Sequence, residues 1–395
     1  MKTSLAQTKV CLVHDWLVAM RGGEKVLEAI AELFPEAPIY TLFSERKNLS
    51  PLLQSREIHT SFLQFIPGIS KWYRWLLPLF PLAVYFLDVC PYDLVISSSH
   101  CVAKAARIKK GGRHICYCHT PMRYLWGFEN DYLRRFPQWL RWMIGLYFKW
   151  LKTWDVVVSQ KVDLFIANSN NTADKIRRFY GKEAVVIHPP ADVPQKEAVD
   201  QQRNSENYFL VVSALVPYKR IELAIEAFNQ LKLPLKIVGD GPLKTALQKM
   251  IRFKGIELEG WLDKETLWNR YANCRALIFP GEEDFGIVPV EAQSFGKPVI
   301  AFGKGGIQDT VVAFQDIEQQ DEKKSTGIFF DEQTAEALIN AIRKFEQLAF
   351  DAAFIQNHAQ KFGRDRFKLE FASYLRSVLH PQIQIPSVDR EGAPR

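Results

Sequence analysis

The chain has 395 residues, of which 47% are hydrophobic and 24% charged, and this composition suffices for two hydrophobic cores of ordinary size. Its 51 basic and 44 acidic residues give a net charge of +7, which weakly favours an anionic ligand or surface. The six cysteines include no C-x-x-C pair, and no helix-turn-helix, zinc or RNP pattern predicts nucleic-acid binding.

The start of the chain does not resemble a secretory signal. Residues 1–9 are polar, and the apolar run Val10–Val13 is far too short for a signal peptide. The longest weakly polar stretch, residues 75–87, is interrupted by Pro78 and Pro81 and is shorter than the roughly 20 residues of a membrane-spanning helix. We therefore expect a cytoplasmic protein without a transmembrane segment.

The first half of the chain alternates short apolar runs with helical patterns, which predicts a parallel sheet. Gly22 and Gly23 lie between the first strand and the first helix, where we expect either a phosphate- or acceptor-binding loop or a plain turn. The predicted strands are Val10–Val13, Leu94–Ser97, Ile115–Cys118 and Leu164–Ala167, and the predicted helix is Glu24–Leu33.

Cys116 and Cys118, with His114 and His119 nearby, raise the question of a zinc site. Alternate residues of one strand lack the usual geometry of a zinc knuckle, so we predict no metal site there. The cysteines instead suggest buried thiols in a reducing compartment.

Two stretches interleave aromatic and basic side chains, residues 71–77 and residues 132–150. This composition suits a helix that lies in the headgroup layer of an anionic membrane. The alternative is that the aromatic rings pack inside the first domain while the arginines extend outward.

The second half begins after a polar segment. Residues 191–206 are rich in Pro, Gln and charge, which predicts a linker between an N-terminal domain at 1–190 and a C-terminal domain at 207–364. A last helix at 365–380 and a disordered tail at 381–395 are also expected. The predicted strands of this half are Tyr208–Ser213, Leu235–Val238, Ala276–Phe279 and Gly296–Ala301, and its predicted helices include Glu222–Leu231, Val288–Ser294 and Glu336–Gln347.

Glu283 and Glu291 surround a small apolar turn that follows a predicted strand. Ligands of parallel α/β sheets bind at the carboxyl ends of strands, and each carboxylate can accept two hydroxyl hydrogen bonds, as a vicinal diol requires. Phe285 and Gly286 would add backbone N–H groups. The alternative is a capped helix with Glu291 on a solvated face.

A series of motifs, in their order and spacing, resembles the retaining glycosyltransferases of family 4, in the mannosyltransferase-like branch. The resemblance extends over nearly the whole chain and implies an α/β fold of two Rossmann-like domains facing across a cleft, called GT-B. Its last helix is expected to cross back to the first domain. The motifs are Val13–Trp16, Gly22–Glu24, Cys118–Pro121, Ala167–Ser169, His188–Pro190, Ala214–Arg220 and the E-x7-E element from Glu283 to Glu291 with the residues that follow to Gly306.

The resemblance also implies roles for particular residues. Glu291 matches the residue that binds the donor ribose, Glu283 the residue that faces the donor sugar, and His119 a histidine beside the transferred sugar. In the favoured front-face attack the donor phosphate accepts the acceptor's proton, and Asp15 and His119 remain candidate bases. The residues expected to bind the donor are Gly22, Gly23, Lys219, Arg220, Gly239, Phe285, Gly286, Ile287, Val288 and Glu291.

One position departs from the family pattern. Ala214 stands where an arginine is common, five residues before Lys219. Arg220, where many members have glycine, is a candidate to replace the missing cation. The leaving diphosphate gains negative charge, which fixed cations or a metal must stabilise. Because the chain has no D-x-D motif, we expect Lys219 and Arg220 to do this without a metal, unless they are a solvated surface pair.

The expected activity is therefore hexose transfer without a cofactor to a lipid-linked or oligosaccharide acceptor of envelope polysaccharide, with mannose from GDP-mannose as the favoured donor. Such an enzyme could lie on the inner face of the cell membrane. The alternatives are a nucleotide-sugar 2-epimerase of the same fold and a catalytically silent nucleotide-sugar binding subunit.

Overall fold

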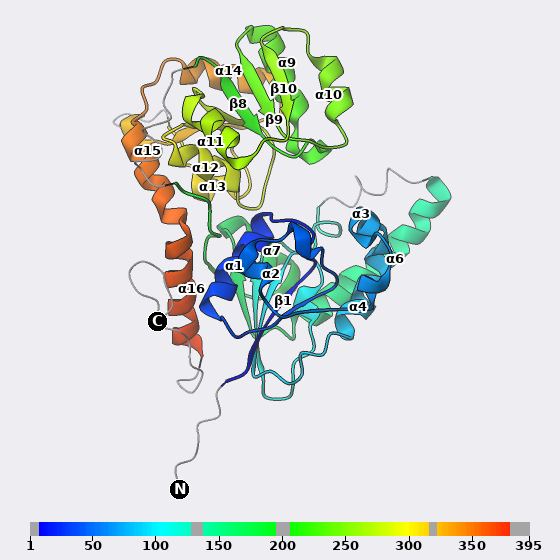
Figure 1. The fold of residues 1–395 in the computed structure, drawn as a ribbon. Helices are drawn as coiled ribbons and strands as arrows, with labels where there is room; N and C mark the ends of the chain where they lie inside the picture. Colours follow the sequence, from blue (N-terminus) through cyan, green and yellow to red (C-terminus); the bar gives the residue numbers. More distant parts are fainter. Residues whose placement is uncertain (1–7, 128–136, 195–205, 316–321, 380–395) are drawn as a thin grey trace. The chain divides into compact units, whose positions relative to one another are not determined.

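The structure is a computed structural model that describes residues 8–127, 137–194, 206–315 and 322–379. It divides into two compact units (Figure 1), one of Met1–Pro190 with Arg364–Arg395 and one of Ala191–Gly363. Most of the predicted linker and the predicted tail lie outside the described residues.

The first unit contains a seven-stranded parallel sheet with the strand order β3-β2-β1-β4-β5-β6-β7. The four predicted strands are present, and the three additional strands have only three residues each, too few for a periodic pattern. The strands are β1 (Val10–His14), β2 (Ile39–Thr41), β3 (Ile58–Thr60), β4 (Leu94–Ser99), β5 (Arg113–Cys118), β6 (Leu164–Ala167) and β7 (Ala184–Val186).

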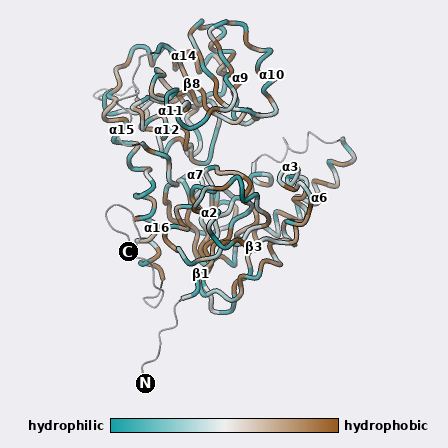
Figure 2. The backbone as a smooth tube through the Cα atoms, viewed as in Figure 1, coloured by the Kyte–Doolittle hydropathy of each residue, from teal (hydrophilic) through white to brown (hydrophobic). Residues whose placement is uncertain are grey.

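Helices cover both faces of this sheet, because alternate strand residues point to opposite sides. Leu12 of β1 packs in the core shared with α1 and α16, whereas Val13 packs in the core shared with α4 and α6. In Figure 2, the hydrophobic residues of this unit are concentrated in its sheet. The helices are α1 (Gly22–Leu33), α2 (Pro51–Gln54), α3 (Ile69–Trp72), α4 (Phe80–Tyr85), α6 (Gln138–Ser159), α7 (Asn170–Tyr180) and α16 (Arg364–Val378).

The chain returns to the first unit through α16. Arg364, the first residue of this helix, forms ion pairs with Glu28 (2.9 Å) and Glu32 (2.8 Å) on α1. Phe367 and Phe371 on the same helix are buried in the core beneath α1. The C-terminal helix thus completes one face of the first sheet.

The second unit has a six-stranded parallel sheet with the order β10-β9-β8-β11-β12-β13. Its strands are β8 (Phe209–Val212), β9 (Leu235–Val238), β10 (Ile256–Gly260), β11 (Leu277–Phe279), β12 (Val299–Phe302) and β13 (Gly327–Phe330). Its helices are α9 (Ile221–Leu231), α10 (Lys244–Met250), α11 (Lys264–Asn273), α12 (Ile287–Ser294), α13 (Ile307–Thr310), α14 (Ala335–Phe345) and α15 (Ala352–Ala359).

Both sheets reverse their strand order once, between β1 and β4 in the first unit and between β8 and β11 in the second. This is the Rossmann order, in which the reversal opens a crevice at the carboxyl ends of the two central strands. The predicted α/β class with two Rossmann-like domains is confirmed. The largest difference in a strand boundary is at β12, which begins at Val299 and not at Gly296, because Gly296 has a φ of +71° and belongs to a turn.

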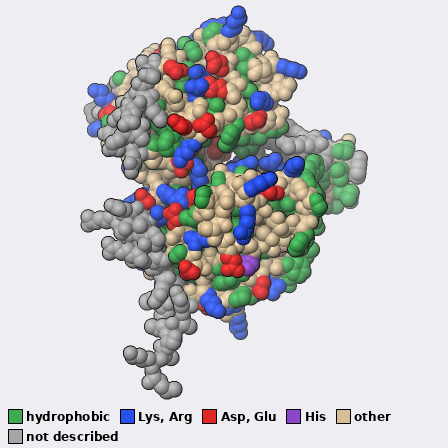
Figure 3. All heavy atoms as spheres, viewed as in Figure 1, with side chains coloured by type: hydrophobic (Ala, Val, Ile, Leu, Met, Phe, Trp, Pro, Cys, Tyr) green, Lys and Arg blue, Asp and Glu red, His purple; other side chains and the backbone are tan. Residues whose placement is uncertain are grey.

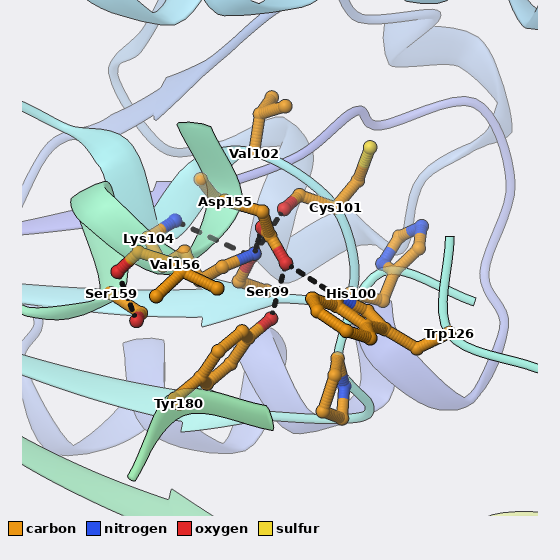
Figure 4. Close-up of polar contacts among 12 residues, drawn as sticks. Ser99, His100, Cys101, Val102, Lys104, Trp126, Asp155, Val156, Ser159 and Tyr180 are labelled. Atoms are coloured by element: carbon orange, nitrogen blue, oxygen red, sulfur yellow. Dashed lines mark hydrogen bonds and ion pairs between the residues drawn. The ribbon is translucent and has the colours of Figure 1, made fainter. Parts of the chain in front are cut away.

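A buried ion pair fixes α6 to the rest of the first unit (Figure 4). The ammonium of Lys104, after β4, lies 2.7 Å from the Asp155 carboxylate on α6. Trp126 Nε1 and the Tyr180 hydroxyl donate to the same carboxylate at 2.9 and 2.8 Å, and Lys104 also donates to the Cys101 carbonyl at 2.6 Å. Although burial opposes its charge, Asp155 raises the pKa of Lys104. The loops after β4 and β5 are thus both tied to α6.

We expect Lys104→Met to lower the free energy of unfolding by about 3–5 kcal/mol, because it leaves the Asp155 charge buried without its cation. Lys109→Met is the matched control, since Lys109 pairs with Asp93 near the surface and should contribute less than about 1 kcal/mol. Denaturant unfolding monitored by circular dichroism measures both. Equal losses in the two variants would contradict the importance of the buried pair.

Candidate active site

Three polar side chains meet at the crevice of the first sheet. His14 ends β1 and is the register partner of Ser98 on β4, and His119 follows β5. The Ser98 hydroxyl lies 3.1 Å from His14 Nδ1 and 2.8 Å from His119 Nε2. One hydroxyl therefore links two imidazole rings on the face of the sheet that α1 covers.

Asp15 holds the loop that follows β4. Its two carboxylate oxygens accept four backbone N–H groups, from residues 100–103, at 2.6–2.9 Å, and His100 Nδ1 lies 3.1 Å from one of them. Burial alone would raise the pKa of Asp15, but His100, His14 and the backbone N–H groups lower it overall. Because its oxygens accept these N–H groups and its pKa is low, Asp15 is better explained as the anchor of this loop than as one of the two candidate bases named from the sequence.

Gly22 and Gly23 form the first turn of α1, directly over the two histidines. A Cβ on Gly23 would lie 3.5 Å from both the His14 and the His119 ring, so a larger side chain would fill the space above them. Glu24 accepts the backbone N–H of Arg21 at 3.1 Å, and burial raises the pKa of Glu24 to about 7. The two glycines thus bring a helix N-terminus, which favours anions, next to the histidine pair.

In the second unit the corresponding crevice holds an ion pair. Lys219 follows β8, Glu283 follows β11, and their side chains contact each other although 64 residues separate them in the sequence. Both side chains are largely buried. Gly281 allows the close approach of the two segments, since a Cβ there would lie 2.9 Å from Lys219 Cα. The fold thus places a cation and a carboxylate together at the carboxyl end of the sheet.

Arg220, the neighbour of Lys219, has a φ of +55°, in the left-handed region where glycine is favoured. Its half-exposed guanidinium forms an ion pair with Glu222 at 2.8 Å. That Arg220 takes over the role of the cation missing at Ala214 stays a prediction.

Glu291 lies in the second turn of α12, where the Tyr271 hydroxyl donates to its carboxylate at 3.0 Å. Tyr271 is buried on α11 and its ring stacks on Phe295, with 5.8 Å between centroids. The core therefore holds Tyr271, and Tyr271 in turn orients Glu291.

The other residues expected to bind the donor stand at the start of α12 and at the end of β9. Gly286 precedes α12 with a φ of +96°, and Ile287 and Val288 begin the helix. The Phe285 ring packs on Phe362 in a buried cluster, so only its backbone is available for a ligand. Gly239 follows β9, where a Cβ would lie 1.8 Å from the Ser213 carbonyl oxygen.

The glycine-rich turn at residues 303–306 supports the Glu283 turn. The N–H of Gly306 donates to the Glu283 carbonyl at 2.7 Å, and a Cβ on Gly305 would lie 2.4 Å from the same oxygen. These glycines are thus needed for close backbone packing.

The two cysteines and the one histidine of β5 lie in the core. Cys116 and Cys118 pack against α7, and His114 hydrogen-bonds the Ser97 hydroxyl at 2.9 Å. Among the residues that the structure describes, no group of three or more His, Cys, Asp or Glu side chains could hold a metal ion.

Three residues of these sites, His14, Ser98 and Tyr271, were not predicted from the sequence as site residues. A signal for the first two exists, since β1 and β4 are apolar until they end in polar residues, and polar carboxyl ends of buried strands are typical of ligand sites. Tyr271 gives no local signal, because only the packing of α11 on α12 brings it to Glu291.

Two protein families match this chain. The family described as "Glycosyltransferase Family 4" matches residues 20–194, and "Glycosyl transferases group 1" matches residues 192–363. The two matches therefore divide the chain close to the boundary between its two units.

Curated relatives and solved structures are similar to the chain at modest identity. O-antigen chain mannosyltransferase C of Escherichia coli is 27% identical over 35% of this chain and 42% of its own length, so the match spans less than half of that relative. Alpha-1,3/1,6-mannosyltransferase ALG2 of Candida glabrata is 23% identical over 67% of both chains. The crystal structure of Anabaena Alr3699/HepE in complex with UDP has a TM-score of 0.67 at 19% identity and covers 94% of this chain and 100% of its own. This likeness shows the fold, which is GT-B as expected.

Proposed function

The chain is built of a domain like Glycosyltransferase Family 4 followed by a Glycosyl transferases group 1 domain, and we propose that it is a retaining hexosyltransferase. It moves mannose from GDP-mannose to a lipid-linked or oligosaccharide acceptor in envelope polysaccharide assembly. The mannosyltransferase relatives support the sugar. The solved neighbour is a complex with UDP, so a uracil base is the competing donor chemistry.

The observation that carries this proposal is the pairing of Lys219 with Glu283 at the crevice of the second sheet, with Glu291 in the next helix. A nucleotide diphosphate sugar needs a cation for its leaving phosphates and carboxylates for its hydroxyl groups. Lys219 supplies the first and the two glutamates supply the second. Glu283 compensates the Lys219 charge in this ion pair, and the donor phosphates would take over that role.

We expect incubation with GDP-mannose alone to release GDP and mannose slowly, because water can replace the missing acceptor. EDTA should leave the initial rate within a factor of about two, since an essential metal would contribute several kcal/mol to the barrier. Chromatography of the nucleotides measures both, with UDP-glucose as the control donor.

Other products would overturn the assignment. An epimerised nucleotide sugar without free GDP would indicate the 2-epimerase. No turnover of either donor, together with nucleotide binding, would indicate a silent binding subunit. A collapse of activity in EDTA that magnesium restores would refute metal independence.

We expect Glu291→Ala to weaken GDP binding, because Glu291 is assigned to the ribose, while Glu283→Ala lowers the transfer rate and leaves GDP affinity nearly intact. Loss of a charge-assisted hydrogen bond of about 1.5–3 kcal/mol corresponds to a roughly 10- to 150-fold higher Kd. Tyr271→Phe keeps the carboxylate but removes the hydroxyl that orients it, so it should weaken GDP binding less. Isothermal titration calorimetry measures the affinities. Equal losses of GDP affinity in both glutamate variants would contradict the different roles assigned to Glu283 and Glu291.

The lipid-linked acceptor is supported by the outer surface of the first unit. Helix α6 has two faces: Phe148 and Leu151 are buried in the core, whereas Trp142 and Trp150 are 70% and 52% exposed. The two interpretations of this stretch from the sequence therefore apply to opposite faces of one helix. Part of the predicted stretch, residues 132–136, lies outside the described residues.

A second segment extends this exposed surface. Trp75 is 69% exposed beside α4, and the Tyr147 hydroxyl donates to the Leu77 carbonyl at 3.3 Å, which connects this segment with α6. Figure 3 shows hydrophobic side chains gathered over α4 and α6. Arg107 lies over the Tyr85 ring at 4.4 Å, so basic groups are interleaved with the aromatic ones. Exposed aromatic rings with basic neighbours suit the headgroup layer of an anionic membrane.

None of the helices in the described part of the chain is long and apolar enough to cross a membrane.

We expect the double variant Trp142→Ser/Trp150→Ser to sediment less with anionic phosphatidylserine vesicles than the wild type, at an unchanged melting temperature because both rings are exposed. Wild-type binding should also weaken as salt rises. Trp261→Ser is the matched control, since this ring is 84% exposed in the second unit. The membrane proposal fails if the wild type does not bind such vesicles at low salt, or if Trp261→Ser reduces binding equally.

A further inference from the structure

One ring nitrogen at the crevice of the first sheet lacks a partner. His14 is 1% exposed, and its Nε2 atom has no hydrogen-bond partner among the described residues. The other nitrogen, Nδ1, faces the Ser98 hydroxyl at 3.1 Å. The environments of the two nitrogens thus differ sharply, and this difference determines where the proton resides.

The proton of His14 belongs on Nδ1. A buried N–H group without an acceptor is rarer and costlier than an unprotonated nitrogen, so Nε2 should carry the lone pair. Burial lowers the pKa of His14 to about 4, which keeps the ring neutral with a single N–H at neutral pH. His14 therefore donates to Ser98.

The Ser98 hydroxyl has only one proton, so the direction of its hydrogen bond with His14 decides the direction of its hydrogen bond with His119. Because its oxygen accepts the N–H of His14, the hydroxyl proton is available for His119 Nε2, 2.8 Å away. His119 Nε2 then accepts, and the single proton of a neutral His119 ring must lie on Nδ1.

We propose that His14 and Ser98 are positioning residues that set the tautomer of His119, so that His119 presents its Nδ1 N–H as a donor and does not act as a base. In the site, this N–H group would donate to a sugar or phosphate oxygen of the nucleotide-sugar substrate. The contact with the substrate rests on the proposed function, whereas the tautomer itself does not. This hydrogen-bond relay links His14 on β1 and Ser98 on β4 to His119 directly after β5, and only the sheet brings the three residues together.

The chain contains a matched pair for comparison. His114 and Ser97 also form a buried imidazole–hydroxyl hydrogen bond on β5 and β4, at 2.9 Å, and burial lowers the pKa of His114 to about 4 as well. This pair lies near the amino end of β5 and has no hydrogen bond to His119. Ser97→Ala therefore removes an equivalent bond without touching the relay.

The tautomers can be measured directly in the unliganded protein. Long-range 15N–1H correlation spectra of 15N-histidine-labelled protein at pH 8, where ordinary histidines are neutral, distinguish protonated from unprotonated ring nitrogens. We expect Nδ1–H forms for both His14 and His119. A His14 Nε2–H or a His119 Nε2–H form in the wild type would overturn the proposal, whatever the enzyme's activity.

Variants test the consequence for turnover. Ser98→Ala should shift the His119 signals toward a mixture of tautomers and lower kcat for GDP-mannose about tenfold or more, the size expected for one lost hydrogen bond to a reacting group, with little change in KM. Ser98→Thr restores the hydroxyl and should restore both signals and kcat, while Ser97→Ala should leave both unchanged. If Ser98→Ala keeps the wild-type His119 tautomer, or if Ser97→Ala changes it equally, the relay does not set it. If the tautomers behave as expected but no variant changes turnover, the claim that the Nδ1 N–H serves catalysis is overturned and the tautomer assignment stands.

Discussion

Four backbone N–H groups converge on the buried carboxylate of Asp15, and much of the first unit depends on that convergence. A buried carboxylate is costly unless its charge is compensated, and the loop at residues 100–103 supplies that compensation. The loop in turn fixes Lys104, whose ammonium reaches Asp155 on α6. Strand end, loop and outer helix are therefore held by one continuous series of charge-assisted contacts, which keeps the crevice between β1 and β4 in a defined shape.

The second unit reaches a similar result by close backbone packing. Gly281 brings the Glu283 loop against Lys219, and Gly305 and Gly306 let the next turn contact the Glu283 backbone. A Cβ at any of these positions would overlap backbone atoms, so the glycines determine how near the cation and the carboxylate lie. A buried charge orders the loop of the first unit, whereas glycines, which have no side chains, let the loops of the second unit pack closely.

Large apolar side chains are exposed on the outer surface of the first unit, where polar residues are usual. Trp142 and Trp150 remain exposed although the opposite face of α6 is well packed, and Trp75 extends the same region. Scattered exposed apolar residues are normal, but exposed aromatic rings gathered in one region with basic neighbours are typical of an interaction site. The same helix carries Asp155, so the exposed surface and the loops of the crevice are parts of one packed assembly.

The sequence by itself determined the alternation of strands and helices and the Glu283–Glu291 element, because these depend on local periodicity and on residues close in the chain. The two Rossmann-like domains were implied by the resemblance of its motifs to the glycosyltransferases of family 4. It could not reveal the strands of three residues, which are too short for a pattern, or the role of Asp15, whose partners are some 85 residues away. Only the tertiary structure joined Lys219 to Glu283 and placed Ser98 between two histidines, because strand register, and not sequence distance, decides which side chains meet at the carboxyl edge of a parallel sheet.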